Sequence, residues 1–253
     1  MFADADLTDD AFLCGRLQLF QPRAGYRAAT DPVLLAACVP AHAGDRVLDL
    51  GCGAGAAALC LAARVPGLLH HGLELQPAYA DLCRRNALRN GVAMTVTEGD
   101  VASNPLRDEF DHVIANPPYY PAAGSPSPIA ARDTALRVET GIDIWVAAGL
   151  RRLRPGGYLT MIFTPDLLPV ALSVQPNATV LPLAAREGRA PGRLIVQWRK
   201  VSKQPFRLLA LFVIHKGPAH DGDRESYTDE ANTVLRGGGA LVAKFSGKAG
   251  HPL

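Results

Sequence analysis

The chain has 253 residues, 48% of them hydrophobic and 20% charged, with a formal net charge of +2 at pH 7. This composition supports a full hydrophobic core and argues against long disorder or a fibrous architecture. A long uncharged stretch, residues 167–185, is interrupted by Pro169, Pro176 and Pro182, so it falls short of the ~20 continuous apolar residues that a membrane span requires. We therefore expect a globular protein with no membrane span.

The amino-terminal segment carries four Asp residues and no basic residue before Arg16, which is the opposite of a secretory signal and predicts a cytoplasmic protein. The five cysteines are odd in number and show neither a CxxC pair nor His neighbours at zinc-ligand spacing. This pattern predicts reduced, packed thiols and no metal site.

Apolar runs alternate with helical patterns from residue 46 onward. The predicted strands span Arg46–Leu50, Leu69–Leu75, Met94–Thr97, Asp111–Ala115 and Tyr158–Thr164. The predicted helices run from the glycine loop to about Arg64, from Pro77 to Asn90, and from Glu139 to Arg154. Strands that alternate with helices of this length predict a doubly wound α/β fold, with a mostly parallel sheet covered by helices on both faces.

Three further apolar segments, Thr179–Leu183, Leu194–Trp198 and Leu208–His215, are joined by Gly, Pro and basic turns. They predict an antiparallel edge to the sheet, and Gly237–Leu253 is expected to fray. We expect a single domain with residues 1–45 as an N-terminal cap, 46–215 as the core and 216–253 as a C-terminal extension.

A glycine loop, Gly51-Cys52-Gly53-Ala54-Gly55, follows the first strand and opens a helix. Glycines let the backbone turn sharply and approach a ligand, and the helix N-terminus beyond them offers free N–H groups. The loop therefore predicts a nucleoside cofactor. Its spacing also satisfies the dinucleotide fingerprint, so a nicotinamide (NAD)-dependent oxidoreductase and a non-catalytic nucleotide-binding module remain alternatives.

Acidic residues near this loop favour a cationic cofactor, S-adenosylmethionine. Asp49 lies two residues before the first glycine, where a carboxylate suits a cation better than a pyrophosphate. Glu74 at the end of the second strand is expected to hold the ribose. Asp100 is expected to accept from the adenine amino group while Val101 packs on the ring, since ligands of such sheets bind at the carboxyl ends of strands. The predicted cofactor-binding residues also include Gly51, Cys52, Gly53 and Leu75.

Asn116-Pro117-Pro118-Tyr119 stands directly after the fourth predicted strand. The prolines stop the strand and fix the backbone, so the Asn116 side chain and the Pro117 carbonyl are presented at a rigid angle. An exocyclic or amide nitrogen is a poor nucleophile because its lone pair is delocalised. Two acceptors that hold its N–H groups would turn the lone pair toward the methyl group, while Tyr119 stacks on a flat base. These four residues are the predicted catalytic set, and Asn116 is also expected to contact the cofactor.

Basic residues concentrate between Arg186 and Arg207, where seven stand against one acid. Such an excess suits a phosphate backbone, although a solvated charged face explains it equally well. The predicted RNA-contacting residues are Arg186, Arg189, Arg193, Lys200 and Lys203.

From about Phe20 to Thr164 the sequence resembles the N6-adenine and amino-group methyltransferases that carry an (Asp/Asn)-Pro-Pro-(Tyr/Phe) motif. Within them, Gly25-Tyr26-Arg27, followed by Asp31 and Leu34-Leu35-Ala36, looks like the signature of bacterial tRNA1(Val) adenine-37 N6-methyltransferases. A looser match runs through residues 227–230.

The resemblance implies a class I methyltransferase (Rossmann-like) fold and methylation of the adenine 3′ of the tRNA anticodon. It also implies that S-adenosylmethionine is bound by the residues matching Asp49, Gly51, Glu74, Asp100 and Asn116. By the same resemblance, the segment from Arg27 to Thr30 lies over the methionine end of the cofactor.

Other interpretations remain open for parts of this picture. Thr30 or Asp31 before Pro32 is also a good helix N-cap, and His112 is expected to be structural. The N2 amine of an rRNA guanine and the N5 amide of a protein glutamine are alternative acceptors. Release-factor methyltransferases share the motif but carry a sizeable helical domain before the glycine loop, whereas 48 residues precede Asp49 here. The loop 122–131 is expected to shape substrate choice.

Overall fold

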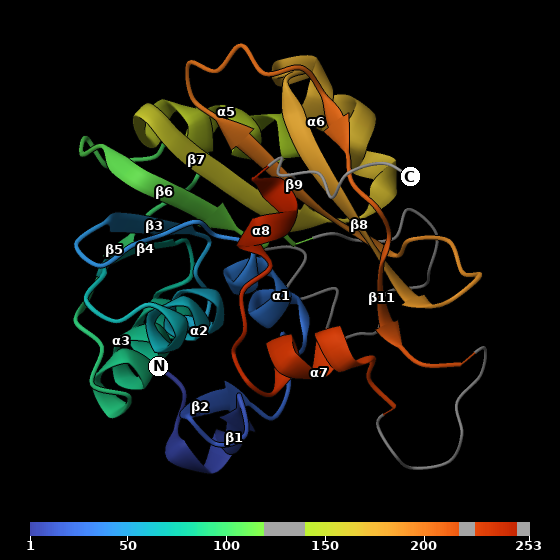
Figure 1. Cartoon of the computed structure of the whole chain (residues 1–253). Helices are drawn as coiled ribbons and strands as arrows, with labels where there is room; N and C mark the ends of the chain where they lie inside the picture. Colours follow the sequence, from blue (N-terminus) through green and yellow to red (C-terminus); the bar gives the residue numbers. More distant parts are fainter. Residues whose placement is uncertain (119–139, 218–225, 247–253) are drawn as a thin grey trace.

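The computed structural model describes residues 1–118, 140–217 and 226–246. Its centre is one sheet in the order β10-β8-β9-β7-β6-β3-β4-β5, with β11 also paired to β8 (Figure 1). The strands of its parallel part are β3 (Arg46–Leu50), β4 (Leu69–Glu74), β5 (Met94–Glu98), β6 (Phe110–Ala115) and β7 (Leu153–Phe163). The strand order therefore reverses between β3 and β6, which is the point where open α/β sheets bind ligands.

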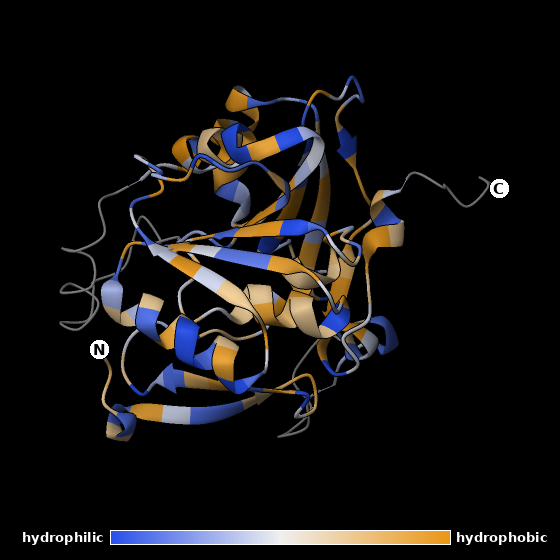
Figure 2. Cartoon of the chain, turned by 90° about the vertical axis from the view of Figure 1, so that its left-hand side faces the viewer, coloured by the Kyte–Doolittle hydropathy of each residue, from blue (hydrophilic) through white to orange (hydrophobic). Residues whose placement is uncertain are grey.

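Helices cover both faces of this sheet, so the predicted doubly wound fold is confirmed. One face carries α1 (Asp31–Ala37), α2 (Ala56–Arg64), α3 (Pro77–Arg89), α7 (Asp229–Leu235) and α8 (Val242–Phe245), and the other carries α5 (Ile142–Arg152) and α6 (Leu168–Val174) (Figure 1). Short 3₁₀ turns occupy Asp4–Asp6 and Pro165–Leu167. Figure 2 shows the helices banded in both hydropathy colours, as amphipathic elements packed on one side should be.

The inner strands of the parallel part are rich in apolar residues because both of their faces are covered. Val47 and Ile114 pack in the cluster under α1 and α2, whereas their neighbours Leu48 and Val113 pack in the cluster under α5. Successive side chains of a strand point to opposite faces, so β3 and β6 need hydrophobic residues on both sides, whereas β4 and β5, farther toward the edge, also carry several polar residues. Within the described ranges, no helix has the length and apolar character needed to cross a membrane.

The antiparallel edge is confirmed, with one correction. β9 (Arg193–Arg199) runs antiparallel to both β7 and β8 (Ala178–Arg186). The predicted strand Leu208–His215 is instead two short pieces, β10 (Arg207–Leu208) and β11 (Phe212–His215), and both run parallel to β8. Both sides of β9 are already paired. The returning chain can therefore join only the outer side of β8, where it has the direction of β8.

The sequence did not reveal an N-terminal hairpin of β1 (Leu7–Phe12) and β2 (Leu17–Pro22). Its second strand lies against α3 and is held there by side-chain amides. The Asn86 amide exchanges hydrogen bonds of 2.8 and 3.0 Å with the backbone of Phe20, and Asn90 does the same with Gln18 at 3.1 and 2.9 Å. The Asn86 amide nitrogen also donates to the carbonyl of Ala54 in the glycine loop at 3.0 Å.

Two smaller expectations are wrong in part. The chain from Gly237 to Ser246 packs on the body of the molecule, since Leu241 and Phe245 are buried and the Leu241 N–H donates to the Ala37 carbonyl at 2.7 Å. Residues 247–253 lie outside the described ranges. All five cysteines are free, but Cys14 is exposed in the hairpin turn rather than packed.

Candidate active site

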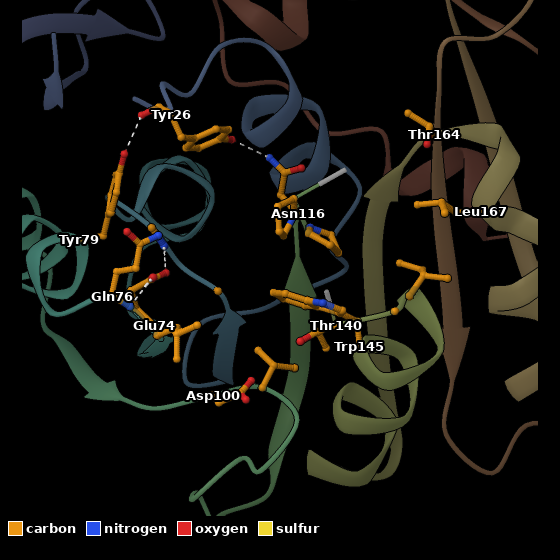
Figure 3. Close-up of a pocket in the computed structure, with 18 of the residues that line it drawn as sticks. Tyr26, Glu74, Gln76, Tyr79, Asp100, Asn116, Thr140, Trp145, Thr164 and Leu167 are labelled. Atoms are coloured by element: carbon orange, nitrogen blue, oxygen red, sulfur yellow. Dashed lines mark hydrogen bonds between the residues drawn. The ribbon is translucent and has the colours of Figure 1, made fainter. Parts of the chain in front are cut away.

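A pocket of about 390 Å³ opens at the carboxyl edge of the sheet, beside the switch point between β3 and β6 (Figure 3). Its volume is in the range of small-molecule sites, roughly 300–1,000 Å³. The predicted site residues that line it are Gly51, Gly53, Glu74, Leu75, Asp100, Val101, Asn116, Pro117 and Pro118. The structure therefore brings the glycine loop and the proline motif together in one cavity.

The glycine loop is shaped by backbone that only glycine adopts easily. Gly51 and Gly53 have φ angles of +65° and +53°, in the left-handed region where a Cβ is strained. A Cβ on Gly51 would also lie 2.5 Å from the Cη2 atom of Trp145 on α5. The missing side chain thus lets the Trp145 ring close against the loop and form a wall of the pocket.

Glu74, the predicted ribose ligand, is buried at the end of β4 with its carboxylate aimed at the loop (Figure 3). One oxygen accepts from the Gly53 N–H at 2.9 Å, and the other accepts from the Gln76 N–H at 2.9 Å. A carboxylate has about four acceptor positions, so these bonds orient it and leave capacity for hydroxyl donors.

Asp100 and Val101 lie side by side on the pocket wall after β5, as the sequence predicts for an adenine site. The Asp100 Oδ1 accepts from the Ala102 N–H at 2.9 Å, a local turn that fixes the direction of the side chain. Val101 is buried and presents an apolar surface beside this carboxylate. The pair thus offers an acceptor next to a flat apolar wall.

Asp49 lies below the loop, in a smaller hollow of about 40 Å³ that it lines together with Cys52, Tyr26 and Asn116. Its Oδ2 accepts from the Ala58 N–H in the first turn of α2 at 3.3 Å. Burial raises the pKa of Asp49 to about 8, and the nearby Glu74 acts in the same direction. An incoming cation would favour the ionised form of this carboxyl group.

Asn116 follows β6 directly, and its side chain reaches both the pocket and the smaller hollow. Its Nδ2 donates to the Tyr26 hydroxyl at 3.1 Å (Figure 3). Pro117 is buried and Pro118 is exposed, so the motif turns from the core toward the cavity within two residues. Tyr119 and the loop 122–131 lie outside the described residues, and their predicted roles stay predictions.

Two residues expected over the cofactor do not line the cavity. The Arg27 guanidinium turns to the N-terminal hairpin, where it donates to Asp10 at 2.7 Å and to Thr8 at 2.8 Å. Thr30 is the N-cap of α1, but its side chain makes no capping hydrogen bond. Neither residue is in the lining of either pocket. For Arg27 the reason is the acidic hairpin, which the sequence did not reveal and which binds its guanidinium.

The five predicted RNA-contacting residues do not share a surface. β8 and β7 run in one direction and β9 in the other. The turn with Arg186, Arg189 and Arg193 is therefore at the pocket side of the sheet, and Lys200 and Lys203 follow β9 at the opposite edge. Of the first three, Arg189 is exposed, whereas the other two are engaged within the protein.

These contacts correct the expectation for individual residues. Arg186 is buried and donates to the Lys216 carbonyl, and Arg193 pairs with Asp31 at 3.0 Å. At the far edge, Lys200 donates to the Leu153 carbonyl. These three side chains are therefore held in structural contacts, although a carboxylate offsets the charge of Arg193 alone among them.

Several lining residues escaped the sequence analysis, because their approach to the site depends on tertiary packing. They are Tyr26, Gln76, Tyr79, Thr140, Gly141, Ile142, Trp145, Thr164, Asp166 and Leu167. Thr164 carried a usable signal, since it follows a parallel strand directly at its carboxyl end. Trp145 carried none beyond its place on the apolar face of a helix.

The chain matches the profile of the methyltransferase small domain over residues 29–169. A release factor glutamine methyltransferase of Geobacter sulfurreducens is 34% identical over 155 residues, which cover 56% of this chain and 50% of that protein. A tRNA1(Val) (adenine(37)-N6)-methyltransferase of Yersinia enterocolitica is 37% identical over 119 residues, or 45% of each chain. One of Porphyromonas gingivalis is 26% identical over 218 residues, or 78% of this chain and 85% of that protein.

The chain thus spans about half the length of the first two relatives. Among solved structures, a predicted O-methyltransferase of Agrobacterium tumefaciens has a TM-score of 0.66 at 24% identity, covering 83% of this chain and 97% of its own. A Thermus thermophilus 16S rRNA guanine-N2 methyltransferase, in complex with S-adenosylmethionine and guanosine, has a TM-score of 0.55 at 19% identity and covers 77% and 50%. At these identities the two structures establish the fold.

The fold is that of the class I, S-adenosylmethionine-dependent methyltransferases. Within that class, the chain belongs to the methyltransferase small domain family. The residues present fit the cofactor: the left-handed glycines leave room for a close ligand, Glu74 keeps acceptor capacity, and Asp100 stands beside the apolar Val101. The carboxylates in and below the pocket suit a group that carries positive charge.

Proposed function

We propose that this enzyme methylates the N6 amine of an adenine in RNA, and specifically adenine 37 in the anticodon loop of a tRNA. The observation that carries the proposal is the entry of Asn116, Pro117 and Pro118 into the same cavity as the glycine loop. The tRNA-modifying relatives, one of which aligns over 78% of this chain, support the choice of acceptor. A tRNA substrate implies a cytoplasmic enzyme.

In this mechanism the protein orients the target amine and does not use a strong base to abstract a proton from it. When bound, S-adenosylmethionine supplies an electrophilic methyl group. The Asn116 Oδ1 and the Pro117 carbonyl accept the two N–H groups of the target amine, so that its lone pair is no longer shared with the ring and faces the donor. Such preorganised acceptors act mainly on the transition state.

The target base has to leave its stack to enter this cavity, as bases do in enzymes that modify them. Beyond Asn116 the pocket continues between Trp145 on α5 and Thr164, Asp166 and Leu167 after β7. This end of the cavity offers apolar surface together with hydroxyl and carboxylate groups. Arg189, exposed in the β8–β9 turn at the same side of the sheet, is available to the phosphate backbone.

Unmodified tRNA1(Val) transcript and methyl-labelled S-adenosylmethionine test the proposal directly. We expect one labelled N6-methyladenosine per transcript by nucleoside mass spectrometry, and none when adenine 37 is replaced by guanine. A chain that labels no adenine in this transcript or in total unmodified tRNA does not have the proposed function.

A protein glutamine is a second candidate acceptor, because the relative of Geobacter sulfurreducens is a release factor glutamine methyltransferase at 34% identity. The side-chain amide of glutamine presents the same two N–H groups to Asn116 and Pro117. The same labelled reaction with a bacterial release factor separates the candidates, since N5-methylglutamine appears only if the protein is the acceptor. Ribosomal RNA in a third reaction tests guanine N2.

A further inference from the structure

The segment from Gly25 to Ala28 crosses the pocket from the N-terminal hairpin toward β6. Its Tyr26 side chain lines both the pocket and the hollow below it and is 44% exposed. The Tyr26 hydroxyl lies 3.1 Å from the Asn116 Nδ2. Figure 3 shows this contact with the amide nitrogen turned to Tyr26 and the amide oxygen turned away from it.

This contact matters because an asparagine amide has two unlike ends. Its oxygen accepts a target N–H, whereas its NH₂ group would meet the target N–H groups as donor against donor. A phenol hydroxyl both donates and accepts, so Tyr26 alone tolerates either orientation. The target amine presents only N–H donors to the other end of the Asn116 amide. These donors need the amide oxygen as acceptor, so the Asn116 side chain matches both partners only when its NH₂ group faces Tyr26.

We propose that Tyr26 is a positioning residue, which accepts a hydrogen bond from the Asn116 NH₂ and thereby holds the amide oxygen toward the target nitrogen. The inference rests on the proposed function, since it concerns an acceptor that presents an N–H group. It assigns a role to the central residue of Gly25-Tyr26-Arg27, of which the reaction scheme above makes no use.

Two sets of contacts hold Tyr26 in place. On one side, the Tyr79 hydroxyl of α3 donates to the Tyr26 carbonyl at 3.3 Å. On the other, the buried Gln21 side chain accepts from the Ala28 N–H at 2.6 Å and donates to the Ala28 carbonyl at 3.3 Å. The backbone that carries the phenol is therefore fixed at the Tyr26 carbonyl and again at Ala28.

Arg27 completes this arrangement from the opposite side of the segment. Its guanidinium bonds Asp10, Thr8 and the Pro22 carbonyl at 2.7, 2.8 and 3.1 Å, all in the hairpin. Consecutive residues thus point in opposite directions, with Arg27 anchored on the hairpin and Tyr26 directed to Asn116. Arg27 was itself expected over the cofactor, and in this structure its positive charge anchors the segment on the hairpin.

The first test compares Tyr26→Phe with the wild-type enzyme in single-turnover methyl transfer to unmodified tRNA1(Val) transcript. One hydrogen bond that acts on the transition state predicts a rate constant lower by roughly tenfold, with unchanged KM for tRNA, cofactor Kd and Tm. Tyr158→Phe is the matched control, because Tyr158 in the middle of β7 stacks on His112 and lines neither the pocket nor the smaller hollow, and we expect the wild-type rate. A wild-type rate for Tyr26→Phe, or a loss that appears only in KM, overturns the proposal.

The second test removes the asymmetry of the amide. In the Asn116→Asp background both ends of the side chain accept hydrogen bonds, so no orientation remains to be selected. Adding Tyr26→Phe to this variant should change its rate by less than about twofold, against roughly tenfold in the Asn116 enzyme. Equal losses in the two backgrounds would show that the phenol acts in another way and overturn the positioning role.

A spectroscopic readout separates this inference from the proposed function. The side-chain ¹H–¹⁵N signals of Asn116, assigned by their loss in Asn116→Asp, should shift in Tyr26→Phe and stay in place in Tyr158→Phe. Unshifted signals contradict the contact even if the enzyme methylates tRNA. Shifted signals in a chain that methylates no tRNA reject the proposed substrate and leave the contact confirmed, with the rate tests then run on the release factor.

Discussion

The two edges of the central sheet both carry polar clusters, and the 390 Å³ pocket lies at the carboxyl edge. At the amino edge, His112 lies 3.1 Å from Asp45, and the Asp111 carboxylate accepts from the Arg46 N–H at 2.8 Å and pairs with Arg154. At the carboxyl edge, Glu74, Asp100 and Asn116 also make local hydrogen bonds, yet all three line the pocket.

The difference lies in what remains after the internal contacts are made. Carboxylates of the amino edge are matched by cations or N–H donors of the same edge, so this cluster ties loops to strands. At the carboxyl edge, backbone N–H groups orient Glu74 and Asp100 and the Tyr26 hydroxyl holds the Asn116 amide, so that these groups border the pocket. A polar cluster in a sequence therefore indicates a site only when the strand order directs it to the edge with the cavity.

The most severe test of this contrast removes one acceptor from the carboxyl edge. Asn116→Ala should lower the rate of methyl transfer by about 10²–10³-fold, as loss of one preorganised group in a transition state does, with the cofactor Kd changed by less than about twofold. Single-turnover kinetics and calorimetry measure the two quantities. Asn177→Ala, just before β8 at the amino edge, serves as the matched control, and a similar loss there would erase the distinction between the edges.

A single added methyl group is expected to destabilise the glycine loop. Gly51→Ala should reduce the free energy of unfolding by about 3 kcal/mol, because the new Cβ meets Trp145 and the left-handed backbone is strained. Gly44 also has a positive φ, but a Cβ there meets no atom within 4 Å. Urea unfolding should thus show a loss of only about 1 kcal/mol in the free energy of unfolding for Gly44→Ala. Equal losses for Gly44→Ala and Gly51→Ala would mean that contact with Trp145 does not explain the effect at Gly51.

His70 offers a test from the amino-terminal half of β4. Burial lowers the pKa of His70 to about 4, and neither ring nitrogen has a hydrogen-bond partner among the described residues. The unfolded chain therefore takes up a proton as the pH falls below about 6.5, while the folded chain does not. Stability should drop by about 2 kcal/mol between pH 7 and pH 4.5, and a His70→Leu variant that keeps the full slope would contradict this.

Cofactor binding should depend on pH through Asp49. Burial raises the pKa of Asp49 to about 8, so in the free enzyme a fraction of the molecules carries this carboxyl group as the neutral acid near neutral pH. Binding of a cationic ligand must then release the proton from Asp49. The Kd for S-adenosylmethionine is expected to fall by about threefold to tenfold from pH 6.5 to pH 8.5. Titration calorimetry should show a flat profile for Asp49→Asn, and a persistent slope would place the titrating group elsewhere.

The smallest effect is expected from the lysines of the amino edge. Lys200→Ala with Lys203→Ala should change the apparent Kd for tRNA by less than about twofold at 100 mM salt, because both follow β9 on the side away from the pocket. Arg189→Ala, at the pocket side, should weaken tRNA binding, and this weakening should be several-fold larger at low salt than at high salt. The reverse ranking would mean that RNA crosses the amino edge.

The parallel strands were predictable from the apolar residues that burial on both faces of a sheet favours, and Arg46–Leu50 was predicted with its observed bounds. The hairpin was not, since β1 carries Thr8, Asp9 and Asp10 and has a mostly polar pattern. It is held by Asn86 on α3 and by Asn90 just after that helix, which are distant in sequence.

For the site, residues next to strand ends were predictable and residues brought in by packing were not. Glu74, Asp100 and Asn116 follow directly from the rule that parallel strands end at one edge. Tyr26 and Trp145 reach the pocket from a crossing segment and from a helix, and no local pattern reports such contacts. The direction of the Arg27 side chain likewise depends on an acidic hairpin that had not been predicted.

The hairpin has a consequence for the glycine loop. It adds no strand to the main sheet, yet the buried side-chain amide of Asn86 on α3 binds both the Phe20 carbonyl in its second strand and the Ala54 carbonyl of the glycine loop. The amino-terminal hairpin and the glycine loop therefore share one hydrogen-bonded side chain. A substitution of Asn86 would remove the support of both at once.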